Sequence, residues 1–257
     1  MSSYIAEFIG TMLLILFGNG VVSNVLLKRT KGNDAGWIVI SAGWGVAVYI
    51  GAFCSNAYSG AHLNPAVTVA NMLCQELSWQ EGGMYMIAQV LGAMIGALLV
   101  YLFYREHFEV TQDPDAKLAC FSTAPNIRNN GQAFFCEMVG TFALILPIFL
   151  IASPSLMHGD APSDTDPTLG LGSIGLLPVG LLVFGIGMSL GGTTGYAINP
   201  ARDFGPRLVH AILPIRGKRD SDWSYAWVPV AGPIAGAILA TAVFWLLSAT
   251  ENNSIGL

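Results

Sequence analysis

The feature that most constrains this chain is a tripeptide that occurs twice, as Asn64-Pro65-Ala66 and as Asn199-Pro200-Ala201. Asparagine is a preferred N-cap residue and proline is favoured at the first helical position, so each tripeptide predicts the start of a helix. Each copy also follows a glycine-rich apolar stretch and lies too close to a flanking apolar span to be an ordinary surface turn. We therefore expect both copies to lie inside a membrane.

The composition is that of an integral membrane protein. Of the 257 residues, 53% are hydrophobic and 11% are charged, whereas a soluble domain usually has about 25% charged residues. Apolar stretches of about twenty residues, long enough to cross a hydrocarbon core about 30 Å thick, alternate with charged clusters. The first stretch lacks a basic n-region, so we do not expect a cleavable signal. We expect six membrane spans, at residues 4–27, 37–57, 84–104, 132–152, 169–190 and 225–248.

Several classes of protein are disfavoured by the same sequence. The net charge is −5, and no basic cluster with interleaved aromatic residues predicts binding to nucleic acid. No nucleophile, base and oxyanion-binding group converge in the spans, so we do not expect an enzyme. The cysteines lack the spacing of metal ligands, and we expect no disulfide, no structural metal and no cofactor. They are Cys54, Cys74, Cys120 and Cys136.

The two halves of the chain resemble each other beyond the tripeptide. The segment 7–11, Glu-Phe-Ile-Gly-Thr, recurs at 137–141 as Glu-Met-Val-Gly-Thr. Pairs of glycines four residues apart let membrane helices approach closely. Such a pair recurs near the end of each half, as Gly92 and Gly96 and as Gly232 and Gly236. Three matches in the same order indicate an internal duplication.

Each half contains three spans and one short segment headed by the tripeptide, at 64–73 and at 199–213. Because three is odd, the second half enters the membrane upside down, and the two short helices meet near the midplane. The non-helical backbone before them, at 59–63 and 191–198, is tolerated at that depth only where it lines a cavity or is buried in protein. Two facing helix starts would form a pore.

We therefore expect one transmembrane channel domain over residues 1–257. It would consist of two inverted repeats, about 4–104 and 132–248, joined by a connecting loop at 105–131. The polar stretch 154–167, which contains three aspartates, is expected to be a flexible linker.

Two longer motifs carry a resemblance to a known family. Residues 59–68, Ser-Gly-Ala-His-Leu-Asn-Pro-Ala-Val-Thr, and residues 195–207, Gly-Tyr-Ala-Ile-Asn-Pro-Ala-Arg-Asp-Phe-Gly-Pro-Arg, resemble the major intrinsic proteins. Within that family the chain is most similar to the aquaglyceroporins, or glycerol facilitators, because Asp203, Arg207 and the non-aromatic pair Pro229-Val230 mark the glycerol branch. The resemblance covers nearly the whole chain.

The resemblance implies an all-α membrane protein with the aquaporin-like fold, six transmembrane helices plus two re-entrant half-helices. It also implies a homotetramer with one pore in each subunit, placed in the lipid bilayer of the plasma (cell) membrane with both termini in the cytoplasm. The charge distribution disagrees with this orientation. All eleven Lys and Arg residues lie at 28–36, 105–131 and 191–224, opposite the termini, and the positive-inside rule would place that face in the cytoplasm. We follow the family, because its pore motif is itself asymmetric.

The resemblance places a constriction near the outer mouth, formed by Trp44, Gly187, Tyr196 and Arg202. Arginine is permanently charged and carries five N–H donors, so inside a membrane it is expected to line a cavity and bind hydroxyl oxygens. Trp44 and Tyr196 would form an apolar corner for a carbon backbone, and Gly187 leaves room that a bulkier residue would fill. Water-selective relatives typically carry histidine in place of Trp44. Tyr196 replaces the phenylalanine of the best-known bacterial facilitators, and its hydroxyl would narrow the pore or add a donor.

At the pore centre, Asn64 and Asn199 are expected to act as donors. If each side-chain oxygen accepts from backbone N–H groups, each amide NH2 points into the lumen. A passing water or hydroxyl then accepts from both amides, which interrupts a proton-conducting chain of waters. The two helix N-termini carry partial positive charge and repel cations and protons.

Two carboxylates, Glu7 and Glu137, lie within the spans, where an ionisable group is a functional candidate by default. They could carry coupled protons, or they could accept hydrogen bonds from the re-entrant loops and hold loop carbonyls toward the lumen. Their symmetrical placement favours the second role, and the resemblance implies it, with Asp203 as a further support. For the His62 side chain we favour packing over a pH gate. The expected pore-lining carbonyls are those of Gly60, Ala61, His62, Gly195, Tyr196 and Ala197.

The expected function is a passive channel for glycerol, other small polyols and uncharged solutes such as urea, with some water, that excludes protons and ions. One alternative is a water-selective aquaporin, which Trp44, Gly187 and Asp203 argue against. Another is an ion-coupled secondary transporter, since inverted repeats and broken helices also occur in that class. Such a carrier would use an ionisable pair at the midplane, where this sequence has amides.

Overall fold

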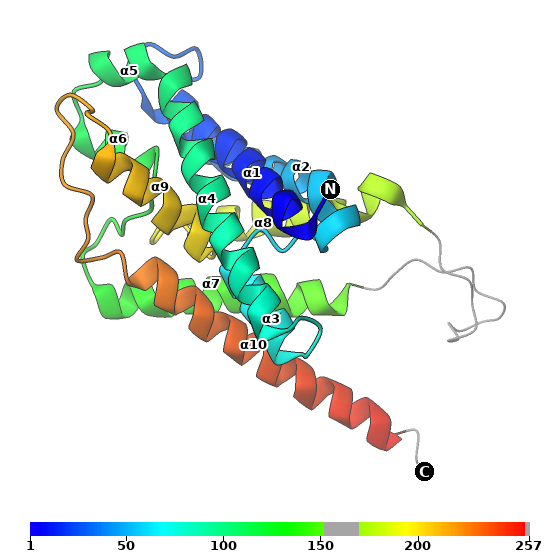
Figure 1. The fold of residues 1–257 in the computed structure, drawn as a ribbon. Coiled ribbons are helices and arrows are strands. Elements are labelled where there is room, and N and C mark those ends of the chain that lie inside the picture. Colours follow the sequence, from blue (N-terminus) through cyan, green and yellow to red (C-terminus); the bar gives the residue numbers. More distant parts are fainter. Residues whose placement is uncertain (152–169, 255–257) are drawn as a thin grey trace.

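The computed structural model describes residues 1–151 and 170–254. Every element in this part of the chain is a helix, and six helices are long and apolar enough to cross a membrane (Figure 1). The linker expected at 154–167 lies outside the described residues. The six spans are α1 (Ser3–Leu26), α2 (Trp37–Ser59), α4 (Trp79–Phe103), α7 (Asn130–Leu150), α8 (Leu177–Ser189) with the preceding 3₁₀ turn η1 (Gly172–Leu176), and α10 (Val228–Ser254).

Two shorter helices begin at the repeated tripeptide. They are α3 (Pro65–Leu73) and α9 (Pro200–Ile212), and each has proline in its first turn and asparagine as its N-cap. In both, the asparagine side chain accepts a hydrogen bond from a backbone N–H of the first turn. Two further short helices, α5 (Arg105–Val110) and α6 (Pro114–Ala119), lie in the loop between α4 and α7.

The start of α4 differs from the sequence-based expectation. The helix begins at Trp79 rather than at residue 84. The Ser78 hydroxyl accepts a hydrogen bond from the Glu81 N–H at 3.2 Å and donates one to the Glu81 carboxylate at 2.9 Å. Ser-x-x-Glu is a polar signal for a helix start, and a search for apolar stretches does not detect it.

Helix packing follows the same plan in both halves. α1 packs along α4 and α7 along α10, and each half-helix packs on the last span of the other half, α3 on α10 and α9 on α4. A Cβ at Gly92 would lie 2.3 Å from the Phe8 carbonyl oxygen, and a Cβ at Gly236 would lie 2.3 Å from that of Met138. The α1–α4 and α7–α10 crossings therefore need glycine at these positions.

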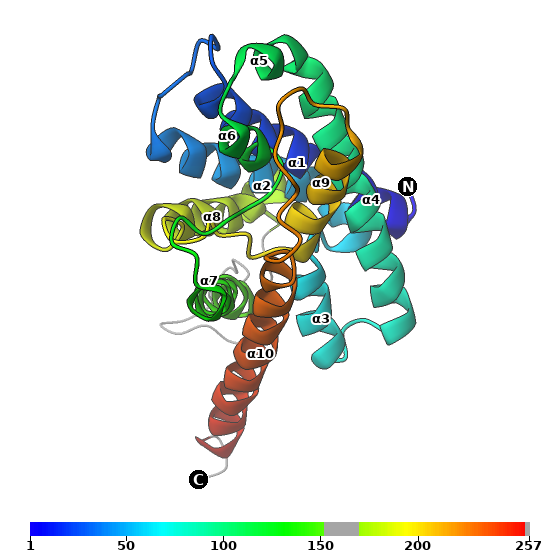
Figure 2. The same ribbon diagram turned by 90° about the vertical axis from the view of Figure 1, so that its left-hand side faces the viewer.

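The cationic loops gather at one end of the molecule. In Figures 1 and 2, α5 and α6 lie at the end opposite the C-terminus. The Lys28 N–H donates to Thr111, which follows α5, and the Lys117 ammonium of α6 donates to the Arg216 carbonyl in the loop after α9. The three loops that carry the Lys and Arg residues are thus joined to one another by hydrogen bonds.

Candidate functional site

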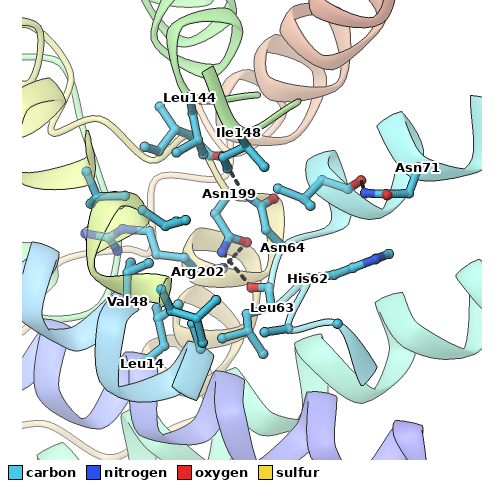
Figure 3. Close-up of a pocket in the computed structure, with 18 of the residues that line it drawn as sticks. Leu14, Val48, His62, Leu63, Asn64, Asn71, Leu144, Ile148, Asn199 and Arg202 are labelled. Atoms are coloured by element: carbon cyan, nitrogen blue, oxygen red, sulfur yellow. Dashed lines mark hydrogen bonds between the residues drawn. The ribbon is translucent and has the colours of Figure 1, made fainter. Parts of the chain in front are cut away.

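The two tripeptides lie side by side (Figure 3). The Asn64 amide donates to the carbonyl of Ile198, and the Asn199 amide donates to the carbonyl of Leu63, each at 2.8 Å. Each side-chain oxygen is bound to N–H groups of its own helix. An amide has two N–H donors, so these cross-bonds leave one N–H of each asparagine for another acceptor. The sequence predicted the pair of donors but not the two acceptor carbonyls.

Both asparagines line a cavity of about 340 Å³. The His62 side chain also borders it, but in Figure 3 the ring points away from the asparagine pair. The ring packs edge-on against Tyr85, and its Nδ1 lies 3.2 Å from the Thr68 hydroxyl. The rest of the wall is largely apolar and includes Leu14, Val48, Leu144 and Ile148.

A second cavity, of about 230 Å³, lies on the side of the connecting loop. Its wall includes Trp37 and Trp44 from α2 and residues Ser122 to Ala124 of the loop. Tyr196 and Arg202 line both cavities. These two residues therefore lie at the boundary between the cavities.

Of the four residues predicted to form a constriction, Tyr196 and Arg202 line both cavities, Trp44 lines the second, and Gly187 packs against Tyr196. The guanidinium carbon of Arg202 lies 4.1 Å from the centroid of the Trp44 ring. Tyr196 packs against Gly187, where a Cβ would lie 2.8 Å from the tyrosine hydroxyl. Trp44, Tyr196 and Arg202 are all buried. Two aromatic rings and one cation thus lie where the two cavities share their lining.

Arg202 is also in contact with the connecting loop. Its guanidinium donates to the Phe121 carbonyl at 3.4 Å, and the same carbonyl accepts from the Asn19 amide of α1 at 3.2 Å. Neither Asn19 nor Phe121 was predicted from the sequence. The loop has no motif that places its carbonyls, and the buried asparagine in α1 was the one available signal.

Glu7 is fully buried in α1 and binds the first re-entrant loop. Its carboxylate accepts from the N–H groups of His62 and Leu63 at 2.9 and 2.7 Å. It also accepts from the Ser59 hydroxyl at 2.6 Å and from the Gln89 amide at 2.7 Å. Four donors from three segments converge on this one carboxylate, so it fixes the loop.

Glu137 is fully buried in α7 and binds the second re-entrant loop in the same way. Its carboxylate accepts from the N–H groups of Ala197 and Ile198 at 3.0 and 2.8 Å, and from the Thr194 hydroxyl at 2.7 Å. In both loops the bonded N–H groups belong to the two residues before the pore asparagine. The two carboxylates therefore occupy equivalent places.

The re-entrant loops adopt a backbone conformation that L-residues rarely take. φ is +54° at Ala61, +51° at Leu63, +38° at Tyr196 and +43° at Ile198. Each such residue costs about 1–3 kcal/mol, which the carboxylate bonds help to offset. Of the six residues whose carbonyls were predicted to line the pore, Gly195 borders the smaller cavity, and the larger is bordered by Gly60, Ala61, His62, Tyr196 and Ala197.

Asp203 binds the connecting loop and a neighbouring arginine. Its carboxylate accepts from the Thr123 N–H and hydroxyl at 2.8 and 2.7 Å. It also accepts from Arg207 at 2.8 and 3.0 Å, and both charged side chains are fully buried. Among the described residues, no group of three or more His, Cys, Asp and Glu side chains could hold a metal ion.

Comparison with known protein families agrees with this arrangement of two half-helices. The family model described as "Major intrinsic protein" matches residues 1–244. The chain belongs to this family. As a major intrinsic protein it is a multi-pass integral membrane channel and not an enzyme.

Individual relatives agree with this assignment. The chain is 52% identical to the "Probable glycerol uptake facilitator protein" of Thermotoga maritima over 247 residues, 96% of this chain and 100% of that protein. It is 45% identical to the "Glycerol uptake facilitator protein" of Bacillus subtilis, over 96% of this chain and 90% of the relative. The X-ray structure of the aquaglyceroporin from Plasmodium falciparum matches with a TM-score of 0.78 at 29% identity, over 94% of each chain. The predicted aquaporin-like fold is confirmed.

The polar partners of the three buried carboxylates were not predicted for this major intrinsic protein. A polar side chain in an apolar helix needs a partner, but the sequence does not say which one, because the partners lie far apart along the chain. The side-chain partners of Glu7, Glu137 and Asp203 are Ser59, Gln89, Thr123, Thr194 and Arg207.

Proposed function

We propose that this major intrinsic protein is a passive channel for glycerol, other small uncharged solutes and some water. The observation that carries the proposal is the boundary between the two cavities, where Trp44 and Tyr196 meet Arg202. A linear polyol has an apolar and a polar side, and both fit this boundary. Its carbon chain lies against the rings, and its hydroxyls accept hydrogen bonds from the guanidinium. The names of the relatives, glycerol uptake facilitator and aquaglyceroporin, support glycerol as a permeant.

Proton exclusion is assigned to the pore centre. Asn64 and Asn199 each keep one N–H for a passing oxygen, while the other is bonded to the opposing loop. A water that accepts from both asparagines cannot also accept a proton from its neighbour in the file. The N-termini of α3 and α9 add a positive potential at the same place.

Glu7 and Glu137 are assigned a structural role rather than a role in proton coupling. In the described part of the chain, each hydrogen-bond partner of the Glu7 carboxylate is a donor, and two of these donors are backbone N–H groups. A proton on this carboxyl would set two donors against each other and free a buried N–H, which costs about 1–3 kcal/mol. A group that cycles protons would need acceptors within reach as well.

We further propose that the chain forms a homotetramer in the plasma membrane, with two inverted repeats per subunit and both termini in the cytoplasm. The exposed cations near α5 and α6 make the orientation worth testing. A green fluorescent protein fused to the C-terminus should fluoresce, and alkaline phosphatase at the same place should be inactive. The reverse pair of results would show that the charge distribution, and not the family pattern, sets the orientation.

The function is tested by stopped-flow light scattering on vesicles that contain the purified protein. We expect rapid re-swelling in glycerol and no proton current under a pH gradient. Osmotic water flux without glycerol uptake would contradict the assignment and favour a water-selective channel. A proton current coupled to solute would favour the transporter.

A further inference from the structure

The hydroxyl of Tyr196 lies outside the space that a solute would occupy. Its oxygen is fully buried, and it packs between α2 and α8. A Cβ at Gly187 of α8 would lie 2.8 Å from this oxygen and 3.0 Å from the Ser41 Cβ of α2. The hydroxyl therefore neither narrows the pore nor offers a donor to it, which were the two alternatives left by the sequence.

The hydroxyl that faces Tyr196 in this space belongs to Ser41. Ser41 is fully buried, and in the described part of the chain neither its hydroxyl nor that of Tyr196 makes a hydrogen bond of good geometry. A buried hydroxyl left unpaired costs about 1–3 kcal/mol. Each hydroxyl is thus the available partner of the other.

Trp37 contacts the same space from the side of the second cavity. Its indole N–H donates to the Gly187 carbonyl at 2.8 Å, and its ring meets the Tyr196 ring edge-on with centroids 5.9 Å apart. Trp37, Ser41 and Trp44 are spaced by four and three residues, so they lie on one face of α2. One helix face therefore carries a filter residue and both contacts to the tyrosine.

The opposite side of the ring has no spare room. A Cβ at Gly191 would lie 2.3 Å from Cδ1 of Tyr196. Glycine at position 191 lets the loop backbone pack against the ring. Tyr196 itself has a φ of +38°. The ring thus contacts Gly191 on one side, Trp37 on another and Gly187 at its hydroxyl end.

We propose that Ser41 and Trp37 are positioning residues that, with Gly187 and Gly191, form a socket for Tyr196. The socket fixes the ring as a wall of the constriction with its hydroxyl turned away from the lumen, and so limits the size of polyol that passes. This inference rests on the proposed function for its consequence on permeants. The solute meets ring carbon atoms, while the hydroxyl serves to anchor the ring.

The test compares Ser41→Ala, Tyr196→Phe and the double variant in reconstituted vesicles. The readout is the permeability for xylitol divided by that for glycerol, which does not depend on how many channels are folded. Each single change should raise this ratio about two- to tenfold, the effect of losing one neutral hydrogen bond. The double variant should match the single variants, because both changes remove the same contact between the two hydroxyls. Ser55→Ala, a buried serine of α2 bonded to its own helix, is the matched control and should leave the ratio unchanged.

Two results would overturn the socket. An unchanged ratio in Ser41→Ala with a changed ratio in Tyr196→Phe would place the tyrosine hydroxyl in the lumen. Effects that multiply in the double variant would show that the two hydroxyls act separately. Trp37→Phe removes the indole donor and should raise the ratio in the same direction, whereas the exposed Trp79→Phe should not; equal ratios in the two would remove Trp37 from the socket.

A second readout separates the socket from the proposed function. Thermal unfolding of the same variants in detergent should show that Ser41→Ala and Tyr196→Phe are coupled, with or without glycerol transport. If the effects of the two substitutions on unfolding are coupled but the channel passes water and no glycerol, the proposal of glycerol as permeant is refuted and the socket stands. Additive unfolding would refute the socket even if glycerol passes.

Discussion

Most buried polar side chains of this channel are held by partners from distant parts of the chain. Glu7 accepts from Gln89, and Glu137 accepts from Thr194. Within a membrane there is no water to satisfy such groups, so an unpaired one costs several kcal/mol. Single residues therefore decide the path of the re-entrant loops.

We predict that Cys120 is unreactive in the folded protein. Burial raises the pKa of its thiol to about 12, so at pH 8 the side chain is almost entirely the unreactive thiol and not the thiolate. Maleimide labelling followed by mass spectrometry should modify Cys120 only after denaturation. Labelling of the native protein at the rate of a free thiol would contradict the burial.

We predict that Arg202→Ala loosens solute discrimination. The guanidinium is the charged donor at the boundary between the cavities, and hydrogen bonds to charged groups contribute about 1.5–3 kcal/mol. The preference for glycerol over other small solutes should fall about tenfold or more in the vesicle assay. Arg216→Ala changes an exposed arginine at the same end and should have no effect. Unchanged discrimination in the first variant would remove Arg202 from the constriction.

At the scale of elements, each half-helix follows a re-entrant loop, and the first helix of the same half carries the carboxylate that binds this loop. α1 carries Glu7 for the loop before α3, and α7 carries Glu137 for the loop before α9. Each loop contains two non-glycine residues with left-handed backbone. The loop conformation is thus imposed by the helix behind it rather than by local preference.

Glu137→Gln should destabilise the second loop. Glutamine brings an NH2 group toward the donors that the carboxylate accepts from, which leaves a buried backbone N–H unpaired. The free energy of unfolding in detergent should fall by about 1–3 kcal/mol. The control is Glu109→Gln, which alters an exposed ion pair with Arg105 at 3.8 Å. It should change the free energy of unfolding by less than about 1 kcal/mol. Equal stability of the two variants would show that the loop does not need the carboxylate.

On the scale of the whole molecule, one buried ion pair joins three segments. Arg207 donates to the carboxylate of Asp203, to the Thr123 carbonyl and to the Ser221 carbonyl. These contacts connect α9 with the loops that precede α7 and α10. The end of the molecule that carries the second cavity depends on this junction.

Arg207→Met should be strongly destabilising, because it leaves the Asp203 carboxylate buried without its cation. The expected loss is about 3–5 kcal/mol of unfolding free energy. The double variant Asp203→Asn, Arg207→Met should recover part of it, since no unpaired charge remains. Chemical unfolding in mixed micelles measures both. A double variant less stable than the single one would mean that the contacts of Asp203 with Thr123 outweigh the charge effect.

Much of the fold could be predicted because its signals are local. Span length follows from runs of apolar residues, and the starts of α3 and α9 follow from an asparagine and a proline in sequence. The start of α4 was misplaced because its signal is polar, in the Ser78 and Glu81 pair. The acceptor carbonyls of Leu63 and Ile198 could not be predicted, because they depend on where two distant loops meet.

The sequence by itself determined that this protein crosses a membrane and that two half-helices, each headed by the tripeptide, lie between its spans. It also indicated, through a family resemblance, which residues would form a constriction. Hydrophobicity and capping act over a few neighbouring residues, so a linear chain displays them. Only the tertiary structure decided which carbonyl each asparagine binds, that Phe121 meets Arg202, and that the Tyr196 hydroxyl turns toward Ser41. Those contacts join residues from different helices, and the close packing of the helices selects them.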